Sequence, residues 1–176
     1  MVSEKFLGYN TACLQDVQKR LAEVDADPHT NIGQHFLVNQ GAIDFLAQTV
    51  NPVSFVIEVG CGVGHITERL AESASSLHGI EIDKRYRPLL DKIACRYSNV
   101  NIIYGDALGV NFERLLREDR GDEGQIVASL PYHITEPFVQ KVSPLRLASV
   151  TLVVGQRYAE SLTSSPTSAG FGRLSI

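Results

Sequence analysis

Apolar and polar residues alternate along this chain in blocks that predict strands and helices in turn. The β-branched apolar run at residues 53–59 is typical of a strand buried on both faces. Shorter apolar runs predict four further strands, at residues 77–82, 100–104, 125–130 and 150–154. Between them, apolar residues at helical spacing predict helices through residues 89–93 and at 111–118, 135–142 and 156–163. Strand and helix therefore alternate from residue 53 onward, which predicts a parallel sheet covered by helices on both faces.

Two helices are predicted ahead of the first strand. Residues 12–24 carry apolar side chains at helical spacing, and a second helix bearing Ile43, Leu46 and Val50 ends at Asn51-Pro52. We expect residues 1–32 to form a helical extension and residues 33–176 to form the main domain.

Composition excludes several classes of protein. With 176 residues, 44% of them hydrophobic and 20% charged, the chain can bury a core. The sequence contains no apolar run approaching the roughly 18 residues of a membrane span. Its three cysteines and five histidines show no metal-binding spacing, so no metal is expected. We expect a cytoplasmic monomer without membrane contact, and the net charge of −4 is unlike that of a stand-alone nucleic-acid binder.

A glycine-rich corner follows the first strand. Gly60, Gly62 and Gly64 allow a sharp backbone turn and close approach of a ligand to a helix start. A dinucleotide fingerprint would need glycine where His65 stands, whereas Glu58-x-Gly60-x-Gly62-x-Gly64 resembles the first motif of S-adenosylmethionine (SAM)-dependent methyltransferases. We expect Glu58 to hydrogen-bond the loop backbone and His65 to be a capping or surface residue.

Ligands of parallel sheets bind at the carboxyl ends of the strands, near the switch in strand order. Glu81 lies about 20 residues past the glycine turn, where an acid can accept both ribose hydroxyls. Asp83 is the competing acid, although it opens the next helix and could cap it. Asp106 is suited to accept from an adenine amino group, or it is a plain turn aspartate.

Ser129-Leu-Pro-Tyr132 at the end of the fourth strand is the second informative element. Adenine's exocyclic amine is a poor nucleophile because its lone pair is delocalised into the ring. A site that accepts both amine hydrogens and stacks the ring can direct that lone pair toward a methyl sulfonium. Here Tyr132 would stack, while the Leu130 carbonyl and the Ser129 side chain would accept. The alternative interpretation is a Pro131 turn that closes a strand.

The ordered set of motifs resembles the ribosomal RNA adenine N6,N6-dimethyltransferase family, which includes small-subunit dimethylases and macrolide-resistance methylases. The resemblance runs from about Ile32 to Ile176 and includes the following stretches: Gly33-Gln-His-Phe-Leu37, Glu58 to Gly64, Gly79-Ile-Glu-Ile-Asp83, Gly105-Asp-Ala107, Ser129-Leu-Pro-Tyr-His-Ile-Thr135 and Gly172-Arg-Leu-Ser175. It implies an α/β, Rossmann-like class I SAM-dependent methyltransferase fold with a mostly parallel sheet. By position it implies that SAM is held by His35, Leu37, Gly60, Gly62, Gly64, Glu81, Asp106 and Ser129, with catalysis at Ser129, Leu130, Pro131 and Tyr132.

Three departures from the family pattern bear on function. His35 and Ser129 stand where the family signatures have asparagine. Residues 1–33 hold three basic residues against five acidic ones, whereas the family implies a basic arm there. The chain stops at Ile176, where the family would continue into its last strands and a helical C-terminal domain.

Three functions fit these residues. The first is SAM-dependent dimethylation of the N6 amine of adenosines in ribosomal RNA, with ribosomal RNA or a small-subunit precursor as partner. The second is a methyltransferase-like protein that binds SAM or RNA with little or no turnover, which Ser129, His35 and the acidic N-terminus favour. The third is methylation of a small molecule, consistent with the negative charge.

Overall fold

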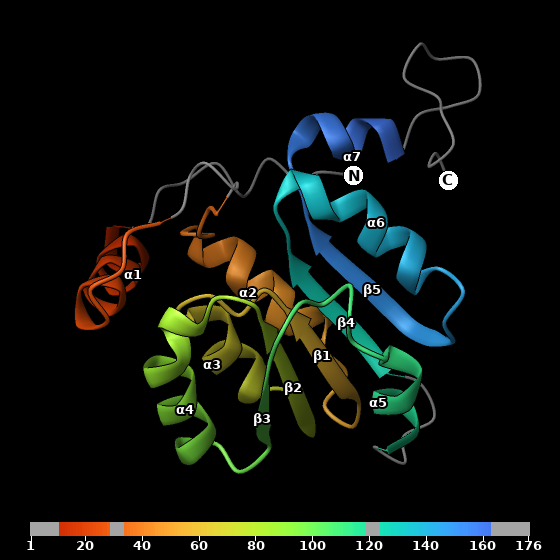
Figure 1. The fold of residues 1–176 in the computed structure, drawn as a ribbon, viewed down its shortest axis with the longest axis horizontal. Coiled ribbons are helices and arrows are strands. Elements are labelled where there is room, and N and C mark those ends of the chain that lie inside the picture. Colours follow the sequence, from red (N-terminus) through yellow and green to blue (C-terminus); the bar gives the residue numbers. More distant parts are fainter. Residues whose placement is uncertain (1–10, 29–33, 119–123, 163–176) are drawn as a thin grey trace.

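The computed structural model describes residues 11–28, 34–118 and 124–162, which form one α/β sandwich (Figure 1). Two helices precede the sheet, and strands then alternate with helices. The elements in chain order are α1 (Thr11–Glu23), α2 (Gln40–Thr49), β1 (Phe55–Val59), α3 (His65–Ala71), β2 (Ser76–Glu81), a 3₁₀ turn (Lys84–Tyr86), α4 (Arg87–Arg96), β3 (Val100–Tyr104), α5 (Phe112–Glu118), β4 (Gly124–Ser129), α6 (Tyr132–Val142), β5 (Leu147–Val153) and α7 (Gln156–Leu162).

The five strands form one sheet in the order β3-β2-β1-β4-β5, and every neighbouring pair is parallel (Figure 1). The predicted parallel sheet is therefore confirmed. Strand order runs outward from β1 in one direction to β3 and then in the other to β5, so the switch lies between β1 and β4. That position places the cleft of such a sheet at the carboxyl ends of these two strands.

Each face of the sheet has its own hydrophobic core, as expected for strands covered by helices on both sides. On one face Val56, Leu77 and Val127 pack with α1, α2, α3 and α4. On the other face Ile57 and Ile126 pack with the buried aromatic rings of α5 and α6. All five residues of β1 are buried, which agrees with the continuous apolar run that predicted it.

The structure corrects three element boundaries. Strand β1 begins at Phe55 rather than at Val53, which lies 81% exposed in the turn before the strand. Helix α6 begins at Tyr132 rather than at Thr135, because Pro131 is its N-cap and the Thr135 hydroxyl donates to the Pro131 carbonyl at 2.9 Å. Strand β5 begins at Leu147 rather than at Val150. Its residues alternate between half-buried and exposed along much of its length, so its apolar signal is weak.

Helix α1 is part of the first core. Cys13, Val17 and Leu21 are buried on it, and Arg20 ion-pairs with Glu68 of α3. The Arg20 guanidinium also donates to the carbonyl of Val63, at 3.4 Å, inside the glycine corner. The N-terminal helix thus packs directly behind the loop that joins β1 to α3.

We expect Gly64→Ala to lower the free energy of unfolding by about 2–4 kcal/mol. Gly64 has φ +81°, and a Cβ there would lie 2.3 Å from Ile93 Cδ1 and 3.1 Å from Leu90 Cδ2. Left-handed strain and overpacking therefore act together. Urea unfolding measures the change.

Gly105→Ala is the matched control for this substitution, because a Cβ at Gly105 meets nothing within 4 Å. It should change stability by no more than about 0.5 kcal/mol. Equal effects of the two alanines would contradict the role assigned to the left-handed turn.

Candidate functional site

The glycine corner is a left-handed turn at the end of β1. Gly60, Gly62 and Gly64 have φ angles of +85°, +53° and +81°, a region that side chains with a Cβ rarely adopt. Two backbone hydrogen bonds fix the turn: Gly60 N–H donates to Ile80 O and Gly64 N–H to Cys61 O, both at 2.9 Å. The corner is thereby attached to β2.

Glu81 lies directly against this corner. Its Oε2 accepts from Gly62 N–H and its Oε1 from Asp83 N–H, each at 2.7 Å. The side chain is buried, and burial raises the pKa of this carboxyl above its ordinary value. The acid at the end of β2 and the glycine turn are therefore one hydrogen-bonded unit.

Asp83 caps the turn that follows β2. The sequence had left open whether it does so or competes with Glu81 as the ligand-binding acid. Its side chain accepts from Arg85 N–H at the start of the 3₁₀ turn and pairs with the Arg85 guanidinium. These bonds hold the pKa of Asp83 at about 2. Asp83 is thus committed to a local turn, whereas Glu81 faces the corner.

The segment 34–39 covers the corner from outside the sheet. Phe36 packs on Gly62, where a Cβ would lie 2.9 Å from Phe36 Cε1. Gln34 anchors the segment by accepting from Tyr86 Oη at 3.0 Å and donating to Asp83 Oδ2 at 3.2 Å. His35 is exposed and Leu37 is half-buried. Two predicted cofactor residues are therefore carried by a segment that contacts the glycine turn.

His65 is not the capping or surface residue that its position predicted. Gly64 is the N-cap of α3, and His65 is largely buried, with Nε2 2.8 Å from the carbonyl oxygen of Leu37. Its ring also meets Phe36 edge-on, with centroids 6.2 Å apart. A helix residue thus fixes the segment that covers the corner. The only sequence signal for it was a histidine in place of a fingerprint glycine.

Ser129-Leu-Pro-Tyr132 meets the corner at the switch point. Ser129 ends β4, and a Cβ at Gly60 would lie 3.1 Å from the Ser129 carbonyl oxygen. Leu130 and Pro131 connect the strand to α6, whose first residue is Tyr132. The Tyr132 side chain lies outside what the structure describes. The backbone of this element and the glycine turn are therefore in van der Waals contact.

Asp106 lies in the turn after β3. It is exposed, its Oδ1 accepts from Leu108 N–H at 2.8 Å, and its carbonyl accepts from Gly109 N–H at 2.9 Å. Gly105 N–H donates to Glu81 O at 2.8 Å, which attaches this turn to the end of β2. Asp106 thus forms a turn at the same edge of the sheet as Glu81.

A buried polar cluster lies beneath the corner. Glu58 and Thr67 are 2% and 0% exposed, and among the described residues neither Glu58 Oε2 nor Thr67 Oγ1 makes a hydrogen bond of good geometry. The expected bond from Glu58 to the loop backbone is not observed among the described residues. Burial raises the pKa of Glu58 to about 7, and the Thr67 hydroxyl and Cys61 thiol lower it in part. Cys61 is buried as a small side chain in the loop, as expected.

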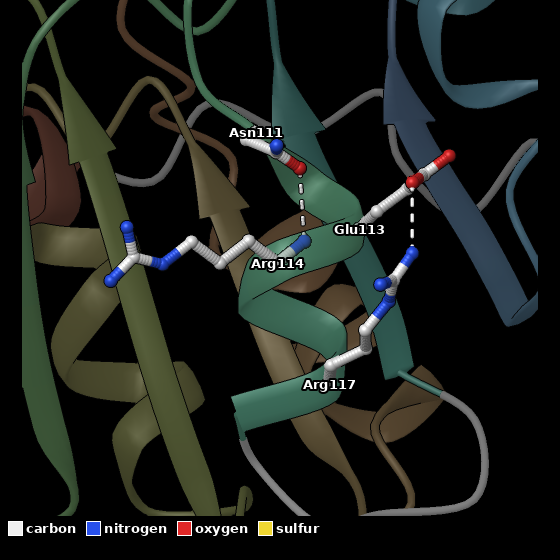
Figure 2. A pocket seen from close by; sticks show the side chains of 4 residues that line it. All are labelled: Asn111, Glu113, Arg114 and Arg117. Atoms are coloured by element: carbon white, nitrogen blue, oxygen red, sulfur yellow. Dashed lines mark hydrogen bonds and ion pairs between the residues drawn. The ribbon is translucent and has the colours of Figure 1, made fainter.

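A separate pocket of about 290 Å³ lies at α5, lined by Asn111, Glu113, Arg114 and Arg117 (Figure 2). Asn111 caps the helix by accepting from Arg114 N–H at 2.9 Å, and Arg117 pairs with Glu113 at 3.1 Å. Figure 2 shows Arg114 and Arg117 pointing away from each other. None of the residues predicted to bind a cofactor lines this pocket, so it is distinct from the corner.

The described ranges contain neither a metal-binding cluster nor a membrane-spanning helix. Across residues 11–28, 34–118 and 124–162, no group of three or more His, Cys, Asp or Glu side chains could hold a metal ion. No helix in those ranges has the length and apolar character needed to cross a bilayer.

Fold and corner together define a Rossmann-like α/β domain of the class I methyltransferase type. The sequence model of the family described as ribosomal RNA adenine dimethylase matches residues 26–176. This chain belongs to that family.

Individual relatives agree with this assignment. Ribosomal RNA small subunit methyltransferase A of Alkaliphilus oremlandii is 32% identical over 151 residues, which cover 83% of this chain and 53% of that protein. A dimethyladenosine transferase from Plasmodium falciparum superposes with a TM-score of 0.69 at 26% identity, covering 81% of this chain and 51% of that one. The 23S rRNA methyltransferase ErmE superposes with a TM-score of 0.62 at 26% identity, covering 73% of this chain and 51% of that one. The chain thus spans about half the length of these relatives.

The Glu58 carboxyl predicts a pH-dependent stability. The carboxyl titrates at its ordinary 4.5 in the unfolded chain and at about 7 in the folded protein, so between these values the folded state binds more protons. Burying the ionised Glu58 carboxylate lowers the free energy of unfolding. This loss of stability is absent below pH 4.5, grows as pH rises and is complete above pH 7. Its full size is on the order of 3 kcal/mol.

Glu58→Gln removes this titration. The free energy of unfolding of the variant, relative to wild type, should therefore rise between pH 5 and pH 8, as measured by urea unfolding. The exposed Glu113→Gln is the control and should show no such rise. A Glu58→Gln difference that stays constant with pH would show that Glu58 is charged in the fold.

Proposed function

We propose that this chain forms the SAM-binding part of an enzyme that methylates the exocyclic N6 amine of adenosines in ribosomal RNA. The observation that carries the proposal is the close packing of Gly60 on the Ser129 carbonyl, because a Cβ added at Gly60 would lie 3.1 Å from that oxygen. A methyl donor held at the corner would lie beside the residues proposed to hold the acceptor amine. Family membership and the names of the relatives support the same reaction.

The corner suits SAM in shape and chemistry. Its three left-handed glycines form a tight backbone turn ahead of α3, and the Glu81 carboxyl is hydrogen-bonded to that turn. The residues proposed to hold SAM are His35, Leu37, Gly60, Gly62, Gly64, Glu81, Asp106 and Ser129. When bound, SAM supplies a methyl group on an electrophilic sulfonium.

Glu81 is proposed to hold the ribose of the cofactor. Each of its oxygens accepts one backbone N–H and keeps a second lone pair for a hydroxyl donor. Asp106 is proposed to accept from the adenine amine of SAM, because its Oδ1 bond to Leu108 N–H fixes the orientation of the other oxygen. Both acids come from neighbouring strand ends of the same sheet edge.

Ser129, Leu130, Pro131 and Tyr132 are proposed to hold the acceptor adenine. The Leu130 carbonyl and the Ser129 hydroxyl would accept the two amine hydrogens, and Tyr132 would stack on the ring. Pro131 fixes the strand-to-helix connection as the N-cap of α6, with φ −60°. Such positioning turns the amine lone pair out of conjugation and toward the methyl group, which is where the rate gain arises.

The proposed substrate is ribosomal RNA within a small-subunit precursor, and the proposed product is the dimethylated adenosine. The protein is proposed to act as a cytoplasmic monomer. RNA of this kind is recognised largely by shape, so residues beyond the adenine pocket would set the choice of site.

Glu81→Gln should weaken SAM binding about tenfold or more, because the amide presents N–H groups where the carboxylate now accepts from Gly62 or Asp83. Isothermal titration calorimetry with SAM measures the affinity. Glu72→Gln on the exposed surface of α3 is the control and should bind as wild type does. Unchanged affinity of the Glu81 variant would refute the assigned cofactor contact.

A second candidate function is SAM binding with little or no turnover, and Ser129 is the observation that favours it. A serine hydroxyl reaches less far than the asparagine amide of the family signature, so the amine would be held less firmly. Loss of one well-placed acceptor of this kind costs roughly 10²–10³ in kcat.

Ser129→Asn should therefore raise methyl transfer at least about tenfold. The assay incubates labelled SAM with under-methylated ribosomal subunits, with Ser143→Asn at the exposed end of α6 as control. Transfer by the variant alone would support the second candidate. Measurable SAM binding with no transfer by either form would refute RNA methylation by this chain.

A further inference from the structure

His65 joins the glycine corner to the segment that covers it. The ring belongs to the first residue of α3, and its Nε2 lies 2.8 Å from the carbonyl oxygen of Leu37, 28 residues earlier in the chain. A carbonyl oxygen only accepts, so Nε2 carries the proton and donates. The bond therefore specifies one tautomer of the ring.

The surroundings of the ring keep it neutral. Nδ1 is buried without a hydrogen-bond partner in the part of the chain that the structure describes, and burial lowers the pKa of the imidazole. The charged groups that face it are Arg20 and Asp16 on α1 and Glu68 on α3. Arg20 opposes a second positive charge there, whereas the two carboxylates favour it. The contact to Leu37 requires a proton on Nε2, and burial keeps the ring in the neutral form that carries only this proton.

The segment is held on both sides of Phe36. Gln34 bonds to Tyr86 and Asp83 on one side, and His65 holds the Leu37 carbonyl on the other. Between these anchors, the Phe36 ring contacts Gly62 and meets the rings of His65 and Tyr86 edge-on. A shift of the Leu37 carbonyl would therefore move the side chains that face the corner.

We propose that His65 is a positioning residue for cofactor binding, which holds the Leu37 carbonyl and so fixes His35, Phe36 and Leu37 against the glycine turn. This role rests on the proposed function, because the segment can contact the cofactor only if SAM binds at the corner. His65 itself does not touch the reacting atoms.

The test compares His65→Gln with His65→Asn, two amides that differ in reach. A glutamine amide nitrogen can occupy the place of Nε2 and donate to Leu37 O, whereas an asparagine amide is too short. We expect His65→Gln to bind SAM within about threefold of wild type and His65→Asn to bind about tenfold more weakly. Tenfold corresponds to about 1.4 kcal/mol, the size of one hydrogen bond.

Chymotrypsin cleavage beside Phe36 and Leu37 gives a readout that is independent of the cofactor. The segment should be cut about tenfold faster in His65→Asn than in wild type or His65→Gln, at equal melting temperatures of the two variants. Cleavage of this kind reports the population of the opened segment.

The outcomes separate the two proposals. Equal cleavage and equal SAM affinity in all three proteins would overturn the positioning role. Equal impairment of both variants would also overturn it, because ring packing rather than the donated hydrogen bond would then matter. If wild type itself fails to bind SAM, the proposed function fails, and the cleavage comparison alone decides whether His65 fixes the segment.

Discussion

The left-handed turn between β1 and α3 is the constraint on which the rest of this site depends. Three of its five residues have positive φ, and only glycine adopts this conformation without strain. Because Gly60 and Gly62 lack side chains, the Ser129 carbonyl and the Phe36 ring can reach the turn from opposite parts of the chain. A wider turn would separate the strand end, the covering segment and the acid of β2.

Contacts from outside the sheet complete the corner. Phe36 and His65 bring the segment 34–39 onto it, and Arg20 brings α1 to the Val63 carbonyl behind it. Helix α1 lies ahead of residues 26–176, which match the family, yet its apolar residues belong to the same core as β1. The loop is thus contacted both by a helix and by an extended segment from the N-terminal part of the chain.

The pKa values of three acids near the corner are shifted differently because their surroundings differ. Asp83 is paired with Arg85 and keeps its charge, with a pKa of about 2. Glu81 is buried but accepts two backbone N–H groups, which partly offset the raising of its pKa by burial. Glu58 is buried, one of its oxygens has no well-formed hydrogen bond within the described ranges, and burial raises its pKa to about 7. The pKa of each acid therefore depends on the hydrogen-bond donors around it and not on burial alone.

The sequence by itself determined the alternating strands and helices, the parallel sheet, the glycine turn and the strand ends that meet at one edge. Buried parallel strands and left-handed turns demand particular residues locally, so they leave a readable pattern. Only the tertiary structure decided that His65 binds the Leu37 carbonyl, that Phe36 rests on Gly62 and that Glu58, among the described residues, makes no hydrogen bond to the loop backbone. Such contacts join residues 26 or more positions apart or depend on burial in three dimensions, and no local periodicity encodes either.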